Sequence, residues 1–102
     1  MIKVRAKLDA DRSVLDMEGH AEFNPGNDIV CAGASAVVNA LAGWLVNSGD
    51  KLTGEPEIIM ESGRAHISAR GGAAVHEAFK QALCGLLNIQ QSYPKNISLD
   101  VV

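Results

Sequence analysis

The chain has 102 residues, of which 47% are hydrophobic and 21% are charged, with a formal net charge of -3 at pH 7. This length supports one hydrophobic core, so we expect a single domain over residues 1–102, and the composition excludes a disordered chain. The acidic balance argues against a nucleic-acid-binding surface, which needs clustered Lys and Arg to neutralise phosphates.

The first predicted element is a β-hairpin. Residues 2–8 and 13–19 alternate apolar and polar side chains, which predicts two half-buried strands, and residues 9–12 supply the turn between them. The register set by this turn places opposite charges face to face: Arg5 with Asp16, and Lys3 with Glu18. His20 then lies at the open end of the hairpin, on its polar face.

The next stretch leads into a helix that carries a cysteine. The run 24–27, Asn-Pro-Gly-Asn, predicts a turn, and Asp28 is a favoured N-cap for a helix beginning directly after it. Cys31 would lie in the first helical turn, where the dipole and free N–H groups favour a thiolate. A thiolate can attack a carbonyl carbon while His20 supplies a proton to the leaving amine, which indicates a cysteine nucleophile.

The same residues have structural interpretations. A free cysteine in an apolar helix is commonly a small buried hydrophobe, and a histidine at a strand end is commonly a surface residue. Asp28 can cap the helix or orient His20, and both roles stay open. The Pro, Gly and Asn content of residues 21–27 predicts a mobile flap, so that His20 and Cys31 align only when a peptide closes it.

Residues 29–46 are nearly all apolar or small, which predicts a helix buried on most sides. The segment is rich in Ala and Gly and falls short of the strongly apolar composition of a membrane span, so we expect no membrane insertion. One side would face the sheet, and the other would be covered by a second helix or a second copy of the chain, which favours a homodimer. Ser35 lies one turn after Cys31, where its hydroxyl could orient the thiol or bond back to the helix.

The second half repeats the plan of the first. Residues 57–61 and 64–70 predict a hairpin around Ser62-Gly63, in which His66 points outward. From Gly72 a period of 3.6 predicts an amphipathic helix that frays over Asn88–Tyr93, with Cys84 near its polar side and inert. A last strand follows with alternating Ile97, Leu99 and Val101. The order ββαββαβ predicts an α+β fold with a mainly antiparallel sheet of about five strands and two helices.

The chain resembles the ribosomal-processing cysteine protease family (Prp, YsxB-like), in its length, its element order and one motif. The motif is Gly19-His20-Ala21, a short loop, then Asp28-Ile29-Val30-Cys31-Ala32 and Ser35. The run Cys31-Ala32-Gly33-Ala34-Ser35 departs from the Cys-Ala-Ala-Val-Ser of that pattern, at a cost of about 1 kcal/mol in helix propensity. The resemblance implies that Cys31 is the nucleophile and His20 the acid/base. It also implies that Gly19, Asp28 and Ser35 support the site or bind substrate.

Three function classes follow from these observations. The first is a cysteine peptidase that acts through an acyl-enzyme, with N–H groups at the helix start as oxyanion donors. The resemblance implies that it is bacterial and that its substrate is the N-terminal leader of a large-subunit ribosomal protein. The second is a metal or redox module, for which no recognised zinc spacing is present. The third is a non-catalytic ribosome-associated or dimerisation module. We expect the first, without cofactor or metal, without direct nucleic-acid contact, and in the cytoplasm, because no secretory leader is evident and the two cysteines are far apart.

Overall fold

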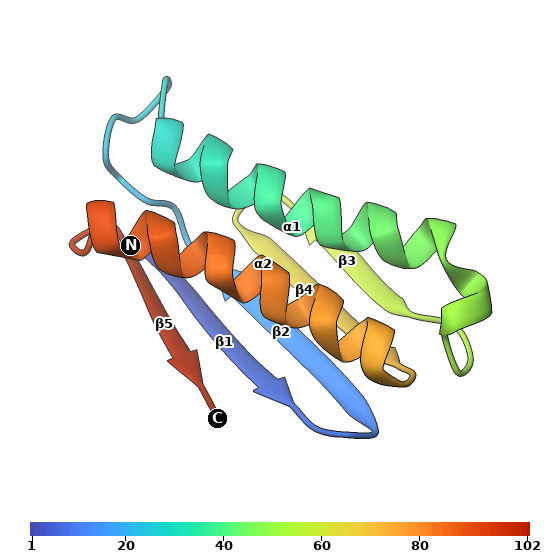
Figure 1. Ribbon diagram of the computed structural model, residues 1–102. Helices are drawn as coiled ribbons and strands as arrows, with labels where there is room; N and C mark the ends of the chain where they lie inside the picture. The colour runs from blue at the N-terminus through green and yellow to red at the C-terminus, as the bar shows by residue number, and fades with distance from the viewer.

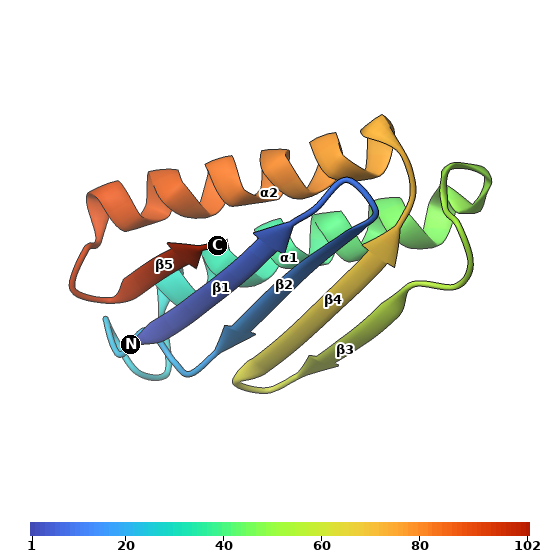
Figure 2. The same ribbon diagram turned by 90° about the horizontal axis from the view of Figure 1, so that it is seen from below.

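The computed structural model describes all 102 residues and confirms the predicted element order. The elements are β1 (Ile2–Leu8), β2 (Arg12–Glu18), α1 (Ile29–Asn47), a short 3-10 helix (Gly49–Lys51), β3 (Glu57–Glu61), β4 (Arg64–Arg70), α2 (Ala73–Ser92) and β5 (Ile97–Val101). They form one five-stranded sheet in the order β3-β4-β2-β1-β5, in which only the β1–β5 pair is parallel. Both helices lie on the same face of the sheet (Figures 1 and 2).

The strand registers agree with the charge and apolar patterns of the sequence. Arg5 pairs with Asp16 and Lys3 with Glu18 across β1 and β2, as predicted. The two-residue turn likewise gives the predicted pairing of β3 with β4: Ile58 with Ile67, Ile59 with His66, Met60 with Ala65, and Glu61 with Arg64. Register is set so strongly because a slip of one residue would move every apolar side chain to the solvent face.

The core fills the space between the sheet and the helix layer. Strand residues that point toward the helices, such as Leu15 and Ile67, are fully buried, and they meet Leu45 of α1 with Phe79 and Leu86 of α2. Helix α1 lies over β4, whereas α2 lies over β2 and β5 (Figure 2). The opposite face of the sheet carries the charged members of each strand, so the core is one-sided.

The outer side of α1 corrects the prediction that this helix is buried on most sides. Val38 and Leu45 are fully buried, but Ala36, Ala40 and Val46 are exposed. The sheet covers one side and α2 one flank, and most of the exposed positions are small or polar, with Ile29 and Val46 as the large apolar exceptions. Our prediction that this segment falls short of the composition of a membrane span is wrong, because α1 is long and apolar enough to cross a membrane by length and composition. Its buried side chains form part of the domain core.

Helix α2 is longer than the sequence pattern predicts. We predict fraying from Asn88, whereas the helix continues to Ser92, and the N–H of Tyr93 donates to the Ile89 carbonyl. Ile89 still packs against the core, which keeps the last turn helical, and Pro94 then prevents continuation. Leu87 is 44% exposed, whereas its neighbour Leu86 is fully buried.

Candidate active site

A cleft of about 200 Å³ opens where three segments of the chain meet: the end of β2, the start of α1 and the β3–β4 turn. Both His20 and Cys31 line it, and so do Gly19 and Ser35. The structure therefore brings together four of the five residues that the sequence singles out. The fifth, Asp28, lies beneath them at the start of α1.

Asp28 is the N-cap of α1, and its carboxylate is fully occupied by backbone donors. Oδ1 accepts from the N–H groups of Val30 at 2.9 Å and Cys31 at 3.1 Å. Oδ2 accepts from the N–H groups of Phe23 at 2.9 Å and Asn24 at 3.1 Å. Of the two roles that the sequence leaves open, Asp28 takes the capping role. It fastens the loop before α1 to the helix that carries Cys31.

This arrangement predicts an acid-dependent loss of stability. Burial acts to raise the pKa of Asp28, but hydrogen bonds from Cys31, Asn24, Phe23 and Val30 outweigh it and hold the pKa below its ordinary value of 3.8. Because the folded-state pKa is the lower one, the stabilisation is complete above about pH 4 and is lost as the pH falls through that folded-state value.

Thermal unfolding of the wild type and of Asp28→Asn checks this prediction. The variant should have a lower Tm at neutral pH and a shallower fall in Tm between about pH 4 and pH 2. Parallel Tm curves for the two proteins across this acid range would show that Asp28 contributes no acid-dependent stability.

Cys31 lies in the first turn of α1, as predicted. The residue is half-buried. Its sulfur accepts a hydrogen bond from the backbone N–H of Ala21 at 3.2 Å, and an N–H donor at this distance stabilises negative charge on sulfur. Ala21 is fixed in turn, because it is 1% exposed and its carbonyl accepts from Asn96 Nδ2 at 3.0 Å. The residue after His20 is thus joined directly to the cysteine.

The exposed His20 ring lies against the β3–β4 turn, and no hydrogen bond joins it to Cys31. A Cβ built on Gly63 would be 2.9 Å from His20 Nε2, so the ring occupies the space that a side chain would fill. The N–H of Gly19 donates to the Gly63 carbonyl at 2.8 Å. His20 and Cys31 thus line the same cleft without a hydrogen bond between them, and their alignment by a bound peptide stays a prediction.

Gly19 has a steric role that the sequence motif alone does not explain. Its φ is +96°, and an added Cβ would lie 2.4 Å from the Met1 carbonyl oxygen. Only glycine adopts this conformation readily at such a close approach. Gly19 thereby lets the chain turn away from β2 directly before His20.

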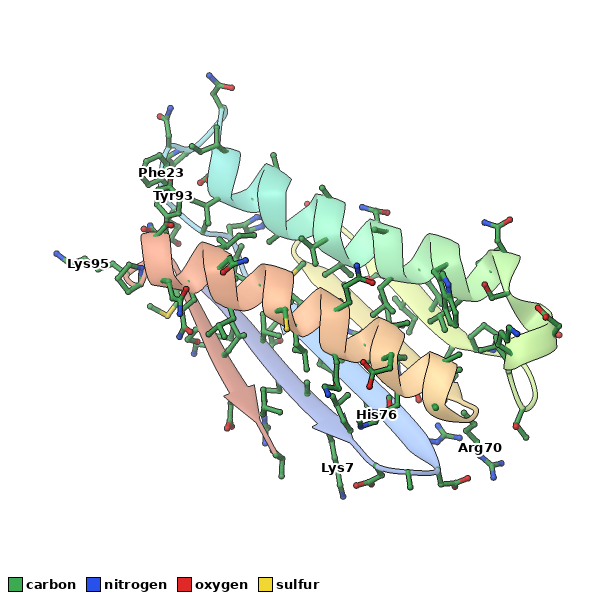
Figure 3. The ribbon with its side chains drawn as sticks, in the orientation of Figure 1. Lys7, Phe23, Arg70, His76, Tyr93 and Lys95 are labelled. Carbon is green, nitrogen blue, oxygen red and sulfur yellow. The ribbon has the colours of Figure 1, made fainter.

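The loop of residues 21–27, our predicted flap, is tied to the domain at several points. Besides the bonds to Asp28, the Phe23 ring meets Tyr93, the residue after α2, edge-on, with ring centroids 5.0 Å apart (Figure 3). The Glu22 carboxylate lies 3.9 Å from the Met1 amino group, and Glu22 has a φ of +58°. Phe23 nevertheless remains 46% exposed at the loop surface. The mobility of this loop stays a prediction.

Ser35 lies on the exposed side of α1, one turn beyond Cys31, and lines the same cleft. Its carbonyl accepts from Asn39 Nδ2 at 2.8 Å, whereas its hydroxyl makes no hydrogen bond to the helix backbone. The alternative of a serine bonded back to its own helix therefore does not hold. The hydroxyl is free to contact a bound molecule.

The β3–β4 turn is the part of the cleft that sequence reasoning missed. Met60, Glu61 and Arg64 line the cleft together with Ser62-Gly63. The only local signal here is a hairpin turn, because the proximity to Cys31 arises from the pairing of β4 with β2 rather than from any motif. His20 follows β2 at the same end of the sheet at which this turn lies.

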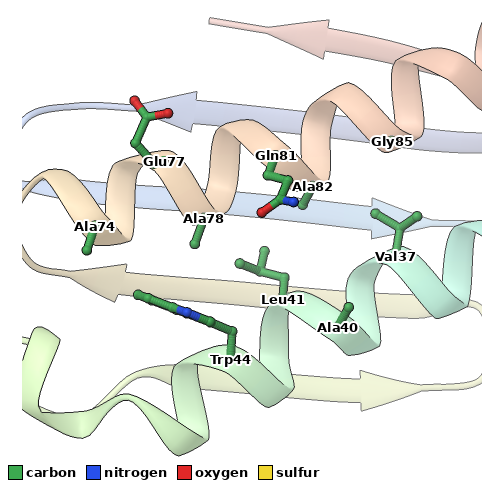
Figure 4. Close-up of a pocket in the computed structure, with 10 residues that line it drawn as sticks. All are labelled: Val37, Ala40, Leu41, Trp44, Ala74, Glu77, Ala78, Gln81, Ala82 and Gly85. Atoms are coloured by element: carbon green, nitrogen blue, oxygen red, sulfur yellow. The ribbon is translucent and has the colours of Figure 1, made fainter.

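Other reactive residues lie outside the cleft. His66 points outward as predicted and bonds through Nδ1 to Asp16 Oδ1 at 2.6 Å, and Cys84 is exposed on α2. No group of three or more His, Cys, Asp or Glu side chains could hold a metal ion. A larger hollow of about 640 Å³ lies between α1 and α2, lined mostly by apolar side chains such as Val37 and Trp44 (Figure 4). It contains no nucleophile or histidine, so the smaller cleft is the candidate active site.

Comparison with known proteins gives consistent results over the whole chain. Residues 1–98 match the family model described as cysteine protease Prp. The ribosomal processing cysteine protease Prp of Staphylococcus aureus is 34% identical, and the match spans 98% of both chains. A crystal structure of Prp from S. aureus with a covalently linked product peptide is 28% identical, with a TM-score of 0.85 over the full length of both chains. A second S. aureus Prp structure, with a substrate peptide, is 26% identical with a TM-score of 0.74.

Proposed function

The chain belongs to the cysteine protease Prp family, and from this premise we propose that it removes a short N-terminal extension from a large-subunit ribosomal protein. The names of the relatives describe ribosomal processing, and the S. aureus structures contain a substrate peptide and a covalently linked product peptide. The observation that carries the proposal is the single cleft lined by both His20 and Cys31.

In the proposed reaction, Cys31 and His20 act in sequence on the scissile peptide bond. The Cys31 thiolate attacks the carbonyl carbon and forms a C–S bond. His20, as imidazolium, donates a proton to the leaving amine nitrogen while the C–N bond breaks, which leaves a thioester. Neutral His20 then takes a proton from water, whose oxygen attacks the thioester carbon. The C–S bond then breaks, which restores the thiolate, and the carboxylic acid product loses its proton to solvent and leaves as a carboxylate.

The Ala21 N–H group is the proposed oxyanion donor, which revises our expectation that the helix start supplies it. The N–H groups of Val30 and Cys31 already donate to the Asp28 carboxylate, and that of Ala32 donates to the Asp28 carbonyl at 3.0 Å. The Ala21 N–H is 3.2 Å from the sulfur. During the attack, negative charge moves from the sulfur to the oxygen of the attacked carbonyl. The Ala21 N–H lies next to the sulfur and is therefore placed to donate to that oxygen.

Ser35 and the predicted homodimer complete the proposal. The free Ser35 hydroxyl is a candidate contact for the peptide backbone, since it lines the cleft one turn from Cys31. The large apolar side chains Ile29 and Val46, which are exposed on α1, support pairing of two copies, because exposed apolar surface is commonly covered in an assembly.

The test of the proposed function is cleavage of a defined peptide. The protein is incubated with a synthetic peptide that spans the leader junction of a large-subunit ribosomal protein, and the products are identified by mass spectrometry. We expect a single cut at the junction that is insensitive to EDTA and blocked by a thiol-alkylating reagent. An intact peptide after prolonged incubation, or loss of cleavage with EDTA, would contradict the proposal.

Selective alkylation gives an independent prediction about the nucleophile. Iodoacetamide near neutral pH should modify Cys31 faster than Cys84, because only Cys31 combines a helix N-terminus with an N–H donor to sulfur. Exposure alone favours the reverse order, since Cys84 is exposed and Cys31 is half-buried. Peptide mapping of the alkylated protein over time measures both rates. Equal rates, or faster modification of Cys84, would count against an activated Cys31.

A further inference from the structure

The imidazole of His20 has no side-chain hydrogen-bond partner that could orient it. All four positions on the Asp28 carboxylate are taken by backbone N–H groups. Asp16, on the neighbouring strand, is bonded to His66 instead. A histidine that acts in proton transfer must nevertheless be held in a defined place, because the reaction depends on its position relative to the nucleophile.

The support that the structure provides is Gly63, in the β3–β4 turn. A Cβ on Gly63 would lie 2.9 Å from Nε2, 3.3 Å from Cε1 and 3.7 Å from Cδ2 of His20. Three ring atoms thus lie around the position that a Cβ of residue 63 would occupy. The carbonyl of the same glycine accepts the N–H of Gly19 at 2.8 Å. Gly63 contacts both the ring and the backbone that immediately precedes it.

We propose that Gly63 is a positioning residue of the active site, whose missing side chain leaves the space in which the His20 imidazole lies, in the cleft that Cys31 also lines. This inference rests on the proposed function, in which His20 transfers the proton. The conformation of the β3–β4 turn explains only part of the need for glycine at position 63. With a φ of +75°, this position favours Gly, but Asn also tolerates such a conformation in many turns. The contact with His20 disfavours Asn as well, because any Cβ at position 63 would occupy space that the His20 ring fills.

A comparison of two glycines separates the contact with His20 from the conformation of the turn. Gly54 has a φ of +80°, close to that of Gly63, but a Cβ there would meet nothing within 4 Å. It precedes β3, whereas Gly63 follows β3, so the five-residue strand separates Gly54 from the cleft. Alanine at either position bears the same backbone strain. At Gly63 the Cβ also displaces the His20 ring, which is the free end of a side chain and moves more readily than the backbone.

The expected result is a loss of rate without a matching loss of stability. Gly63→Ala should lower kcat for the leader-junction peptide by about 10- to 100-fold with KM little changed, because misplacement of a catalytic group acts on the transition state. Gly54→Ala should keep the wild-type kcat. The two variants should lose a similar few degrees of Tm. Gly63→Asn should reduce kcat as Gly63→Ala does.

Ring NMR signals provide a readout that a merely structural change would not move. The chain has three histidines, so three Cε1–H signals are expected, and the one missing from His20→Gln belongs to His20. Gly63→Ala should shift that signal and leave those of His66 and His76 in place, whereas Gly54→Ala should shift none. If Gly63→Ala leaves the His20 signal unmoved, or if its kcat equals that of Gly54→Ala, Gly63 does not position the His20 ring.

The two readouts also separate this inference from the proposed function. If the wild-type protein fails to cleave the peptide, the proposed function is wrong, and the position of the His20 ring signal still decides whether Gly63 positions the ring. If the wild type cleaves and Gly63→Ala is as active as Gly54→Ala, the protease assignment stands and the positioning role of Gly63 is wrong.

Discussion

Replacing Cys31 with alanine is expected to abolish peptide cleavage and to leave the fold intact. Without the sulfur no thioester can form, so kcat should fall by at least about 1,000-fold, the scale seen when a covalent nucleophile is removed. The fold should survive because Cys31 is only half-buried and alanine removes a single heavy atom. Cleavage is measured by mass spectrometry of the leader-junction peptide, and folding by circular dichroism and Tm.

The matched control is Cys84→Ala. Cys84 is the other free thiol of the chain, exposed on α2 and outside the cleft, so its removal should leave both kcat and KM at wild-type values. The pair of variants therefore distinguishes loss of a particular thiol from loss of any thiol. Substantial cleavage by Cys31→Ala, or inactivity of Cys84→Ala at an unchanged Tm, would contradict the assignment of the nucleophile.

The strands and their registers could be predicted from the sequence because the information is local. Alternation with a period of two fixes which side chains face the core, and short turns fix which residues pair. Lys3 with Glu18 and Met60 with Ala65 follow from these two rules alone, and the structure has both pairs. The start of α1 was equally predictable, because Asp28 is a strong N-cap directly before an apolar run.

The cleft itself could be predicted only in part. His20 and Cys31 are 11 positions apart, so a single turn can bring them together, and the motif points to both. The β3–β4 turn is more than 40 positions away from His20 and reaches the cleft only through the pairing of β4 with β2. Nothing in Ser62-Gly63 beyond a turn signal indicates this. Likewise, the choice of Asp28 between capping and orienting His20 depended on which donors surround its carboxylate.

The outer side of α1 shows the limit of composition as a guide to burial. An apolar run of this length predicts cover on most sides, but the run is rich in alanine, which is tolerated in solvent far better than leucine or valine. Val38 and Leu45 face the sheet, while Ala36 and Ala40 are exposed together with the larger Val46. The average hydropathy of the segment does not distinguish the buried positions from the exposed ones.

Gly19→Ala is expected to have the largest effect on stability of any single substitution at the site. At a φ of +96°, alanine stores about 1 to 3 kcal/mol of backbone strain. Its Cβ would also lie 2.4 Å from the Met1 carbonyl oxygen, a backbone atom that cannot rotate away, at a further cost of about 1 to 3 kcal/mol. Domains of this size have roughly 5 to 15 kcal/mol of stability in total, so the variant should be markedly less stable in urea.

The control for Gly19→Ala is again Gly54→Ala, which carries similar backbone strain without a clash. The difference in unfolding free energy between the two variants isolates the contact with Met1. Because Gly19 directly precedes His20 and donates to Gly63, any folded fraction of Gly19→Ala should also cleave more slowly than Gly54→Ala per folded molecule. Equal stability of the two variants would show that the chain start moves aside, and wild-type cleavage by folded Gly19→Ala would show that the path of the backbone before His20 is not critical.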